Sequence, residues 1–297
     1  MAFQKFKPEV WSQKFMEDLD KTLVFKEDCN HTYEGDAKKP GDAVRIFGLG
    51  DVNIGAWHHG KLEQLSTAQE VTGHSILMPI NEIRTFNFEV GDDLDKAQAM
   101  GGSGLMGKFT TKAKDNVADV IDQFIAGLHV GNCDAAFVSG GTPTAVAIDS
   151  NPQNASATYI LDAIDDAYLK LLENNVSRNT KVTLTAPPWF IMMLKRAYVE
   201  LDTDNSAMLA NGRVGRYGGI TLKESNNVYT ATESGHSVAH IQLKTDEAIA
   251  FVNPYTHMEG YRPDLTFIDC VKGYTLFDGM VVAPKQVIDL NVYKYTA

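Results

Sequence analysis

The chain has 297 residues, of which 44% are hydrophobic and 22% are charged. This length predicts about two domains, at the usual ~150 residues per domain, and the composition is typical of a chain that is folded throughout. No run of about 18 apolar residues occurs, so a membrane span is not expected. The N-terminus also lacks the apolar stretch of a secretory signal.

The net charge is −11, which argues against tight nucleic-acid binding as the main role because an acidic surface repels polyphosphate. The three cysteines, Cys29, Cys133 and Cys270, are widely spaced and form no CxxC pair. They predict neither a disulfide framework nor a zinc site, and they fit synthesis in a reducing cytoplasm.

The first segment has the pattern of a helix. Pro8 suits the first helical position, where a missing N–H costs nothing, and bulky apolar residues then recur at every fourth position. These residues are Trp11, Phe15, Leu19 and Leu23. The stripe predicts a helix that packs either on its own domain or on another chain, and the spacing does not decide between the two.

Residues 41–91 lack a helical period, and several glycines separate short strand-like runs. The expected strands cover residues 44–46, 76–78 and 86–90. We predict one long β-hairpin whose tip lies at residues 55–61, which include Trp57 and Lys61. An isolated hairpin cannot cover its own apolar face. The hairpin is therefore expected to lie on a neighbouring subunit, or else to fold back onto its own domain.

Helical and strand periods alternate through the rest of the chain. Helices are predicted at residues 92–100, 110–130, 156–173 and 187–201, and strands at 182–185, 214–222, 239–243, 248–252 and within 265–282. Residues 131–153 have the composition of a link, and no element is predicted after Pro284. This order indicates a mixed α+β chain rather than a repeating βαβ chain.

The predicted helix at 110–130 is amphipathic. Its apolar face carries Val117, Ile121, Phe124 and Leu128, whereas Asp115, Asp119 and Asp122 are expected to face away from the core.

Residues 102–108 have the glycine and lysine spacing of a phosphate-binding loop. Such a loop needs a preceding strand and a Ser or Thr after its lysine. Phe109 follows Lys108 and a helix-like stretch precedes the glycines, so a glycine hinge is the preferred interpretation. A cytoplasmic nucleotide-dependent enzyme that uses Lys108 stays as an alternative.

Other residues with catalytic side chains lack the spacing of a known site. The pairs His58 with His59 and His236 with His240 lack the helical HExxH arrangement and are predicted to be surface histidines. Ser139 lies outside any GxSxG motif. Asp162, Asp165 and Asp166 are expected on the solvated face of a helix. No catalytic, cofactor or metal site is therefore predicted.

Two further features concern the backbone and the surface. Gly215, Gly218 and Gly219 lie in a strand context, which predicts positive φ or close backbone approach and hence a tight bend. Glu259 and Arg262 could pair within the chain or across a subunit boundary. A surface pair of this kind contributes only ~0–1 kcal/mol, so its role would be in register.

Several stretches, taken in chain order, carry a resemblance to a known family. They are residues 8–12, 33–36, 40–46, 86–99, 214–227 with its Ser225-Asn226-Asn227 run, 248–251, 259–273 and 281–284. Together they span nearly the whole chain and resemble the major capsid (coat) proteins of tailed bacteriophages.

The resemblance implies the Hong Kong ninety-seven-type capsid fold, an α+β architecture with several named parts. These would be an N-terminal arm at 1–40, an extended loop at 41–91, a peripheral domain with a long spine helix at 92–150, an axial domain at 151–254, peripheral strands at 255–283 and a C-terminal segment at 284–297. Some members cross-link a lysine of the extended loop to an asparagine. Lys61 lies near the predicted tip, but no asparagine is matched to it.

The resemblance also implies a structural protein without enzymatic activity or cofactors. Such a chain would self-assemble into hexamers and pentamers of an icosahedral head, in the host cytoplasm and then in the virion. A separate scaffolding protein, a portal and packaged double-stranded DNA bound without sequence specificity would be its partners, with no membrane partner. The candidate inter-subunit contacts are Trp11, Phe15, Leu19, Trp57, Lys61, Glu259 and Arg262. An encapsulin nanocompartment, which shares the fold, is the alternative.

Overall fold

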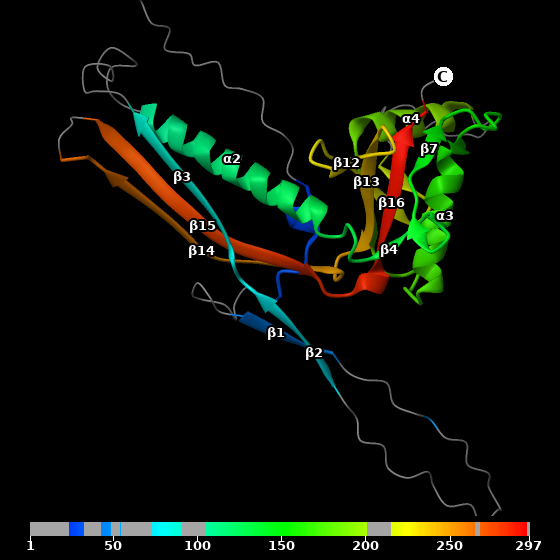
Figure 1. Cartoon of the computed structure of the whole chain (residues 1–297), viewed down its shortest axis with the longest axis horizontal. Helices are drawn as coiled ribbons and strands as arrows, with labels where there is room; N and C mark the ends of the chain where they lie inside the picture. Colours follow the sequence, from blue (N-terminus) through cyan, green and yellow to red (C-terminus); the bar gives the residue numbers. More distant parts are fainter. Residues whose placement is uncertain are drawn as a thin grey trace, which may run out of the picture.

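The computed structural model describes residues 24–32, 43–48, 54, 73–90, 105–200, 215–264 and 268–295. It shows a broad α/β body at one end, a long narrow sheet with one helix that leads away from this body, and a short hairpin that projects from their junction (Figure 1). The predicted arm helix, the hairpin tip and the predicted helix at 92–100 lie outside the described residues.

The body is built on a nine-stranded sheet with the order β10-β11-β9-β13-β16-β7-β8, in which β12 also pairs with β13 and β4 with β16. The strands are β4 (Asp134–Ala135), β7 (Val146–Asp149), β8 (Thr158–Tyr159), β9 (Val182–Ala186), β10 (Arg216–Tyr217), β11 (Ile220–Glu224), β12 (Thr230–Glu233), β13 (His236–Thr245) and β16 (Val287–Lys294). All five side chains of β9 are buried, as its continuous apolar and threonine run predicts for a central strand.

Helices cover both faces of this sheet. Apolar residues at helical spacing, such as Leu161, Ile164 and Leu171, bury one side of α3 (Ile160–Glu173) in the main core, next to α4 (Pro188–Glu200). The C-terminal half of α2 (Leu105–Gly127) covers the opposite face, where the Gln242 side chain of β13 donates to the carbonyl oxygen of Ile125 at 3.1 Å. Figure 1 shows α2 and α3 on the two sides of β13 and β16.

The narrow sheet has the order β14-β15-β3, and it packs α2 on one face. Its strands are β14 (Ile249–Tyr261), β15 (Asp269–Val281) and β3 (Glu82–Val90). The rings of Phe124 on α2 and Phe277 on β15 meet edge to face at 5.4 Å. The other face carries Asn87, Lys272 and Glu259 side by side in the strand register, and none of the three is buried.

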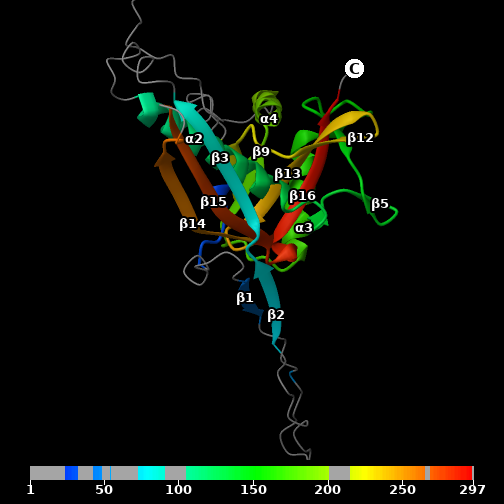
Figure 2. The ribbon, with the colours of Figure 1, turned by 60° about the vertical axis from the view of Figure 1, so that its left-hand side comes forward.

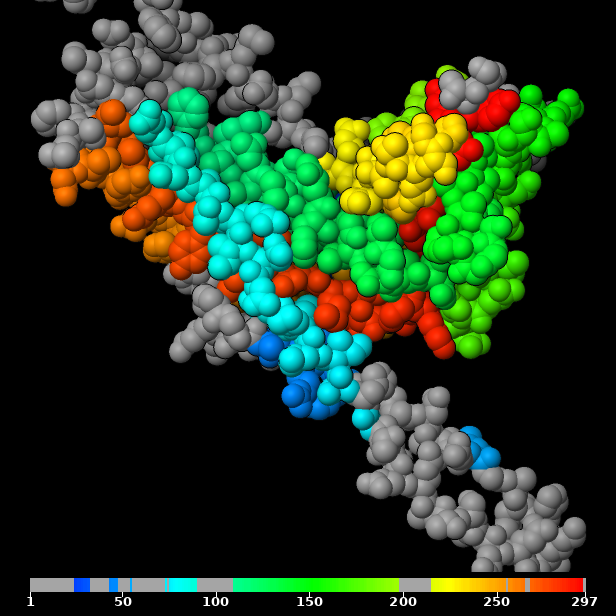
Figure 3. Space-filling view, viewed as in Figure 1, coloured from blue at the N-terminus to red at the C-terminus, as the bar shows by residue number. Residues whose placement is uncertain are grey.

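The projecting hairpin consists of β1 (Ala43–Gly48) and β2 (His74–Pro79), which pair antiparallel from Ala43 opposite Pro79 to Gly48 opposite His74. The base of the hairpin packs on its own chain, because its inner side chains form a second small core with Ala250, Val252 and Leu276. Those inner side chains are Val44, Ile46 and Met78, together with the adjoining Ile80. The hairpin stands away from the body in Figures 2 and 3.

The prediction of one hairpin over residues 41–91 was wrong in its last strand. Residues 82–90 pair with β15 instead of β1, with Phe86 opposite Gly273 and Phe88 opposite Val271. The alternation of aromatic and polar residues was recognised correctly, but alternation does not specify the partner strand.

The region after Pro284, predicted to have no element, forms η3 (Pro284–Gln286) and the central strand β16. The residues predicted as a link, 131–153, include β4, β5 (Val138–Ser139), β6 (Thr142–Pro143) and β7. Strand β16 was missed because its buried residues include Asp289 and Asn291, which are untypical of a core strand. The predicted bend near Gly218 is confirmed, since Gly218 has φ +54° in the turn between β10 and β11.

Gly273 allows the Phe86 ring to lie directly over β15. A Cβ atom at Gly273 would come within 2.5 Å of the ring carbon Cζ of Phe86 and 2.8 Å of the carbonyl oxygen of His257. We therefore expect Gly273→Ala to lower the free energy of unfolding by ~1–3 kcal/mol, the usual cost of overpacking. Gly260→Ala is the matched control, because a Cβ atom there would meet the Cys270 carbonyl oxygen only at 4.0 Å, an ordinary contact distance. Equal denaturant midpoints for the two variants would contradict this.

Candidate functional site

Most of the predicted contact residues cannot be placed. Trp11, Phe15, Leu19, Trp57 and Lys61 lie outside the described residues, as do His58 and His59. Lys108 lies in the first turns of α2, while the glycines that precede it lie outside the described residues.

Glu259 lies near the end of β14, on the face of the narrow sheet that α2 does not cover, and Arg262 directly follows this strand. Glu259 lies 3.6 Å from the Nζ atom of Lys272 on the neighbouring strand, and the Nε atom of Arg262 donates to Asp269 at 2.7 Å. The same Lys272 ammonium also lies 4.9 Å from the centre of the Tyr261 ring. These interactions connect β14 and β15 within one chain, so an inter-subunit role for Glu259 and Arg262 stays a prediction.

A buried carboxylate on α2 holds the short segment at residues 24–32. Asp122 is fully buried, and its Oδ1 atom accepts hydrogen bonds from the backbone N–H groups of Phe25 at 2.8 Å and Lys26 at 3.2 Å. The N–H group of Val24 also points to it, at 3.5 Å. The prediction that Asp122 faces away from the core was therefore wrong, because helical periodicity cannot show that a buried segment supplies donors to an acid.

The Ser225-Asn226-Asn227 run completes this arrangement. The Asn227 side-chain amide donates to Asp119 at 2.8 Å and to Asp122 at 3.1 Å, and its backbone N–H donates to the Ser225 hydroxyl at 3.1 Å. Asn227 thereby fixes α2 to the loop that follows β11. Its place in the sequence resemblance was the only signal for this role.

The same segment is attached at two further points. Asp28 is buried and pairs with the Lys223 ammonium of β11 at 2.8 Å. Asn30 joins the start of β14, since its N–H donates to the Ile249 carbonyl at 2.8 Å and its carbonyl accepts from Phe251 at 3.1 Å. Residues 24–32 therefore connect α2, the nine-stranded sheet and the narrow sheet.

A second buried carboxylate, Asp289 on β16, lies between two histidines. It accepts a hydrogen bond from His129 Nε2 at 3.2 Å and from His240 Nδ1 at 2.9 Å. The amide of Asn291, oriented with its nitrogen toward the carboxylate, donates to it at 2.7 Å. Gln242 donates to His129 Nδ1 at 2.9 Å, which assigns the His129 proton to Nε2. This polar joint, formed by His129, His240, Gln242, Asp289 and Asn291, lies where the chain leaves α2.

His240 is buried, so the prediction that it is a surface histidine was wrong, whereas His236 is exposed and stacks on the Tyr293 ring at 4.2 Å. Burial lowers the pKa of His240, but the hydrogen bond and charge of Asp289 and the charge of Glu233 outweigh it and raise this pKa above 6.5. The buried Nε2 atom of His240 lies 3.7 Å from a Glu233 oxygen. Both ring nitrogens thus face a carboxylate.

The pKa values of two neighbours also shift. Burial raises the pKa of Asp289, yet hydrogen bonds from His129 and His240 outweigh this effect and hold the pKa below 3.8. Burial, followed by the charge of Asp289, raises the pKa of the Cys133 thiol to about 12. A thiol with such a pKa is almost entirely protonated at neutral pH and is a poor nucleophile.

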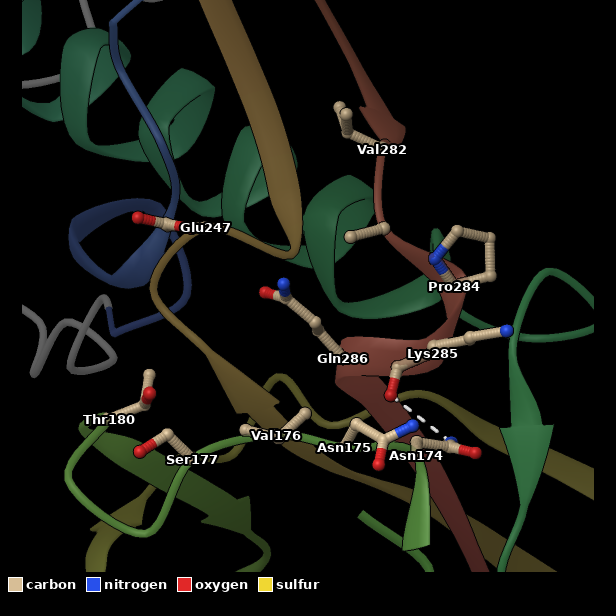
Figure 4. Close-up of a pocket in the computed structure, with 11 residues that line it drawn as sticks. Asn174, Asn175, Val176, Ser177, Thr180, Glu247, Val282, Pro284, Lys285 and Gln286 are labelled. Carbon is tan, nitrogen blue, oxygen red and sulfur yellow. Dashed lines mark hydrogen bonds between the residues drawn. The ribbon is translucent and has the colours of Figure 1, made fainter. Parts of the chain in front are cut away.

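A cavity of about 700 Å³ lies beside the two connections between the sheets, at residues 246–248 and 282–286 (Figure 4). Its polar lining includes Asn174, Ser177, Glu247, Lys285 and Gln286. The Asn174 side chain donates to the Lys285 carbonyl oxygen at 3.1 Å, and this hydrogen bond joins the end of α3 to the connection at 282–286. The described residues contain no cluster of metal-ligating side chains, and no described helix is long and apolar enough to cross a membrane.

Comparison with known proteins rests on structure. No family model matches the chain, and no curated protein matches it in sequence. A structure of Mycobacterium phage Che8 superposes with a TM-score of 0.75 at 24% identity, covering 98% of each chain. The capsid structure of cyanophage P-SCSP1u gives a TM-score of 0.71 at 15% identity, covering 97% of this chain and 93% of that one.

A third match, the capsid of Ralstonia phage GP4, gives a TM-score of 0.65 at 13% identity over 100% of this chain and 98% of that chain. The similarity covers the body, the narrow sheet and the connections between them rather than one domain. The chain therefore has the fold of phage capsid subunits, and the α+β architecture predicted from the sequence is confirmed.

Replacing Asp122 tests the attachment of residues 24–32. Asp122→Ala leaves the N–H groups of Phe25 and Lys26 without their acceptor, and an unsatisfied buried group costs ~1–3 kcal/mol. We expect the free energy of unfolding to fall by at least about 2 kcal/mol and proteolysis within residues 24–32 to accelerate. Asp166→Ala, on the exposed face of α3, should change neither. Protection of residues 24–32 equal to that of the parent chain would contradict the assignment.

The polar joint predicts a pH-dependent stability. The raised pKa of His240 means that its contribution is present below pH 6.5 and is lost as the pH rises through the folded-state pKa. The lowered pKa of Asp289 means that its contribution is present above pH 3.8 and is lost as the pH falls. His240→Gln should therefore destabilise the chain by ~1.5–3 kcal/mol near pH 5.5 and by less at pH 8.5, as measured by urea unfolding. A difference that does not change with pH would refute a charged His240.

Proposed function

We propose that this chain is the major capsid protein of a tailed bacteriophage, a structural subunit that assembles with copies of itself into a closed head around double-stranded DNA. The observation that carries the proposal is the similarity to phage capsid subunits over essentially the full length of both chains. The same proposal includes assembly into hexamers and pentamers, a separate scaffolding protein and a portal. It also includes the division of the chain into the six segments predicted from the sequence, from the N-terminal arm to the C-terminal segment.

The hairpin supports an assembly role through its outer face. Phe47 is 79% exposed and Leu77 is 52% exposed, although the opposite face of the same two strands is buried in the chain's own small core. Burying one such side chain contributes ~1.5–3 kcal/mol. A second copy that covers both side chains would therefore add several kcal/mol at this one place. Trp57 and Lys61, near the predicted hairpin tip, belong to the same proposed contact.

The surface charge suits a wall that encloses DNA without binding it tightly. The exposed face of α3 carries Asp162, Asp165 and Asp166, as predicted from the sequence. These carboxylates repel phosphate, and the net charge of −11 has the same effect over the whole chain. The absence of catalysis is part of the proposal: the buried His240 and Asp289 do not face the large described cavity, whose lining contains neither residue.

The double variant Phe47→Ser, Leu77→Ser tests the hairpin contact. We expect a folded, soluble subunit that no longer forms closed shells, because both side chains are exposed in the single chain and so add little to its own stability. Electron microscopy and native mass measurement give the readout. Leu169→Ser is the matched control, since Leu169 is 54% exposed and belongs to α3, a helix that lies far from the hairpin (Figure 1).

Normal shells from the double variant would contradict the hairpin contact. Deletion of residues 50–64 tests the same role more severely and should also leave a soluble subunit that does not close into shells. The parent chain itself should form a megadalton particle. A stable small oligomer of the parent would contradict the capsid proposal, whereas shells filled with protein cargo in place of DNA would identify a nanocompartment.

A further inference from the structure

A small groove separates α2 from the face of the narrow sheet that it covers. It has a volume of about 170 Å³. The α2 wall contributes Lys114, Val117, Ala118 and Ile121, the sheet contributes Phe86, Asn253, Thr256, Met258 and Thr275, and Lys26 completes the lining. A cavity of ~150 Å³ can hold a benzene molecule, so this groove has room for one leucine or phenylalanine side chain.

The lining specifies the chemistry of an occupant. Val117 and Met258 offer apolar surface, while no carboxylate of the described residues forms an ion pair with Lys26 or Lys114. The side-chain oxygen of Asn253 is buried and has no hydrogen-bond partner in the described part of the chain. Leaving such an acceptor unsatisfied costs ~1–3 kcal/mol. The groove therefore suits an apolar side chain on a segment that also carries acidic groups and a free hydrogen-bond donor.

The residues that precede Val24 meet this description and begin beside the groove. Asp122 holds the backbone at Val24, Phe25 and Lys26, and Lys26 itself lines the groove. Leu19 is five residues before Val24, a span of ~7.5 Å in a helix. Glu17, Asp18 and Asp20 flank it, and Thr22 and Lys21 supply donors.

The spacing of the two partners also agrees. Leu23, Leu19 and Phe15 are four residues apart, and Ile121 and Val117 on α2 are four residues apart as well. A helix that ends at Val24 and runs parallel to α2 would bring Leu23 to Ile121 and Leu19 to Val117, since residues four apart share one helix face. Asp20 or Glu17 would then lie near Lys114.

We propose that Leu19 of the same chain occupies this groove. The tether at Val24 makes the contact intramolecular, with an effective concentration in the millimolar range or above, so the chain's own segment competes well against a neighbour's. This inference goes beyond the proposed function and does not depend on it. It assigns Leu19 to the chain's own groove and leaves Trp11, two turns further from the tether, to reach a neighbouring copy.

Cross-linking in the full-length, unassembled chain tests the proposal. Cysteines replace Leu19 and Met258, which is 41% exposed, in a background where Cys133 is replaced by serine. We mix isotope-labelled and unlabelled chains, add a short bis-maleimide, and identify linked peptides by mass spectrometry. The expected result is a high yield of links between residues 19 and 258 in which both peptides come from one isotopic pool.

The matched control places the cysteine at Lys21 instead of Leu19. Residue 21 is about 200° around a helix from residue 19, so Lys21→Cys with Met258→Cys should link at least several-fold less. Equal yields from the two positions, or no link from Leu19→Cys, would overturn the proposal. Links between isotopic pools would also overturn it and would place the segment on a second copy. Since shells are not required, failure here is distinguishable from failure of the capsid proposal.

Discussion

The burial of two carboxylates, Asp122 and Asp289, is the constraint on which the arrangement of this molecule depends. Each is satisfied by donors from segments distant in the sequence: Asp122 by residues 24–26 and Asn227, Asp289 by His129 and His240. Leaving a buried charge without partners costs far more free energy than any single apolar contact contributes to stability. The C-terminal half of α2 must therefore stay in one position against the nine-stranded sheet, which fixes the direction in which α2 and the narrow sheet extend from the body.

That fixed direction gives a subunit with two kinds of surface. The body is covered by helices on both faces of its sheet. The narrow sheet is covered by α2 on one face only, and its other face carries the polar side chains of Asn87, Lys272 and Glu259. The hairpin also has two different faces: Val44 and Ile46 are buried in the chain's own small core, whereas Phe47 is exposed. A chain that extends apolar side chains on a projecting hairpin gains by covering them with another copy, and this gain is the physical basis of the assembly proposed above.

The polar joint adds specificity more than strength. Replacing a well-packed buried ion pair by apolar residues is often neutral or stabilising, so a buried pair is weak support for stability as such. What the joint of His129, His240 and Asp289 provides is a single geometry, because Asp289 accepts from both histidines while Gln242 donates to the second ring nitrogen of His129. In the proposed capsid role a unique geometry matters more than additional stability, because every copy would have to repeat the same angles.

The residue pattern alone was enough to predict the α+β class, most of the helices and strands in the described residues, the bend at Gly218 and, through the resemblance, the fold of phage capsid subunits. Periodicity carries this information because it reports which face of each element is buried. Three features became visible only in the folded chain: residues 82–90 pair with β15, residues 287–294 form a central strand, and Asp122 and His240 are buried. Local pattern could not show these points, since strand partners are chosen by contacts across long separations, and a polar residue can be buried only where distant segments bring its donors and acceptors.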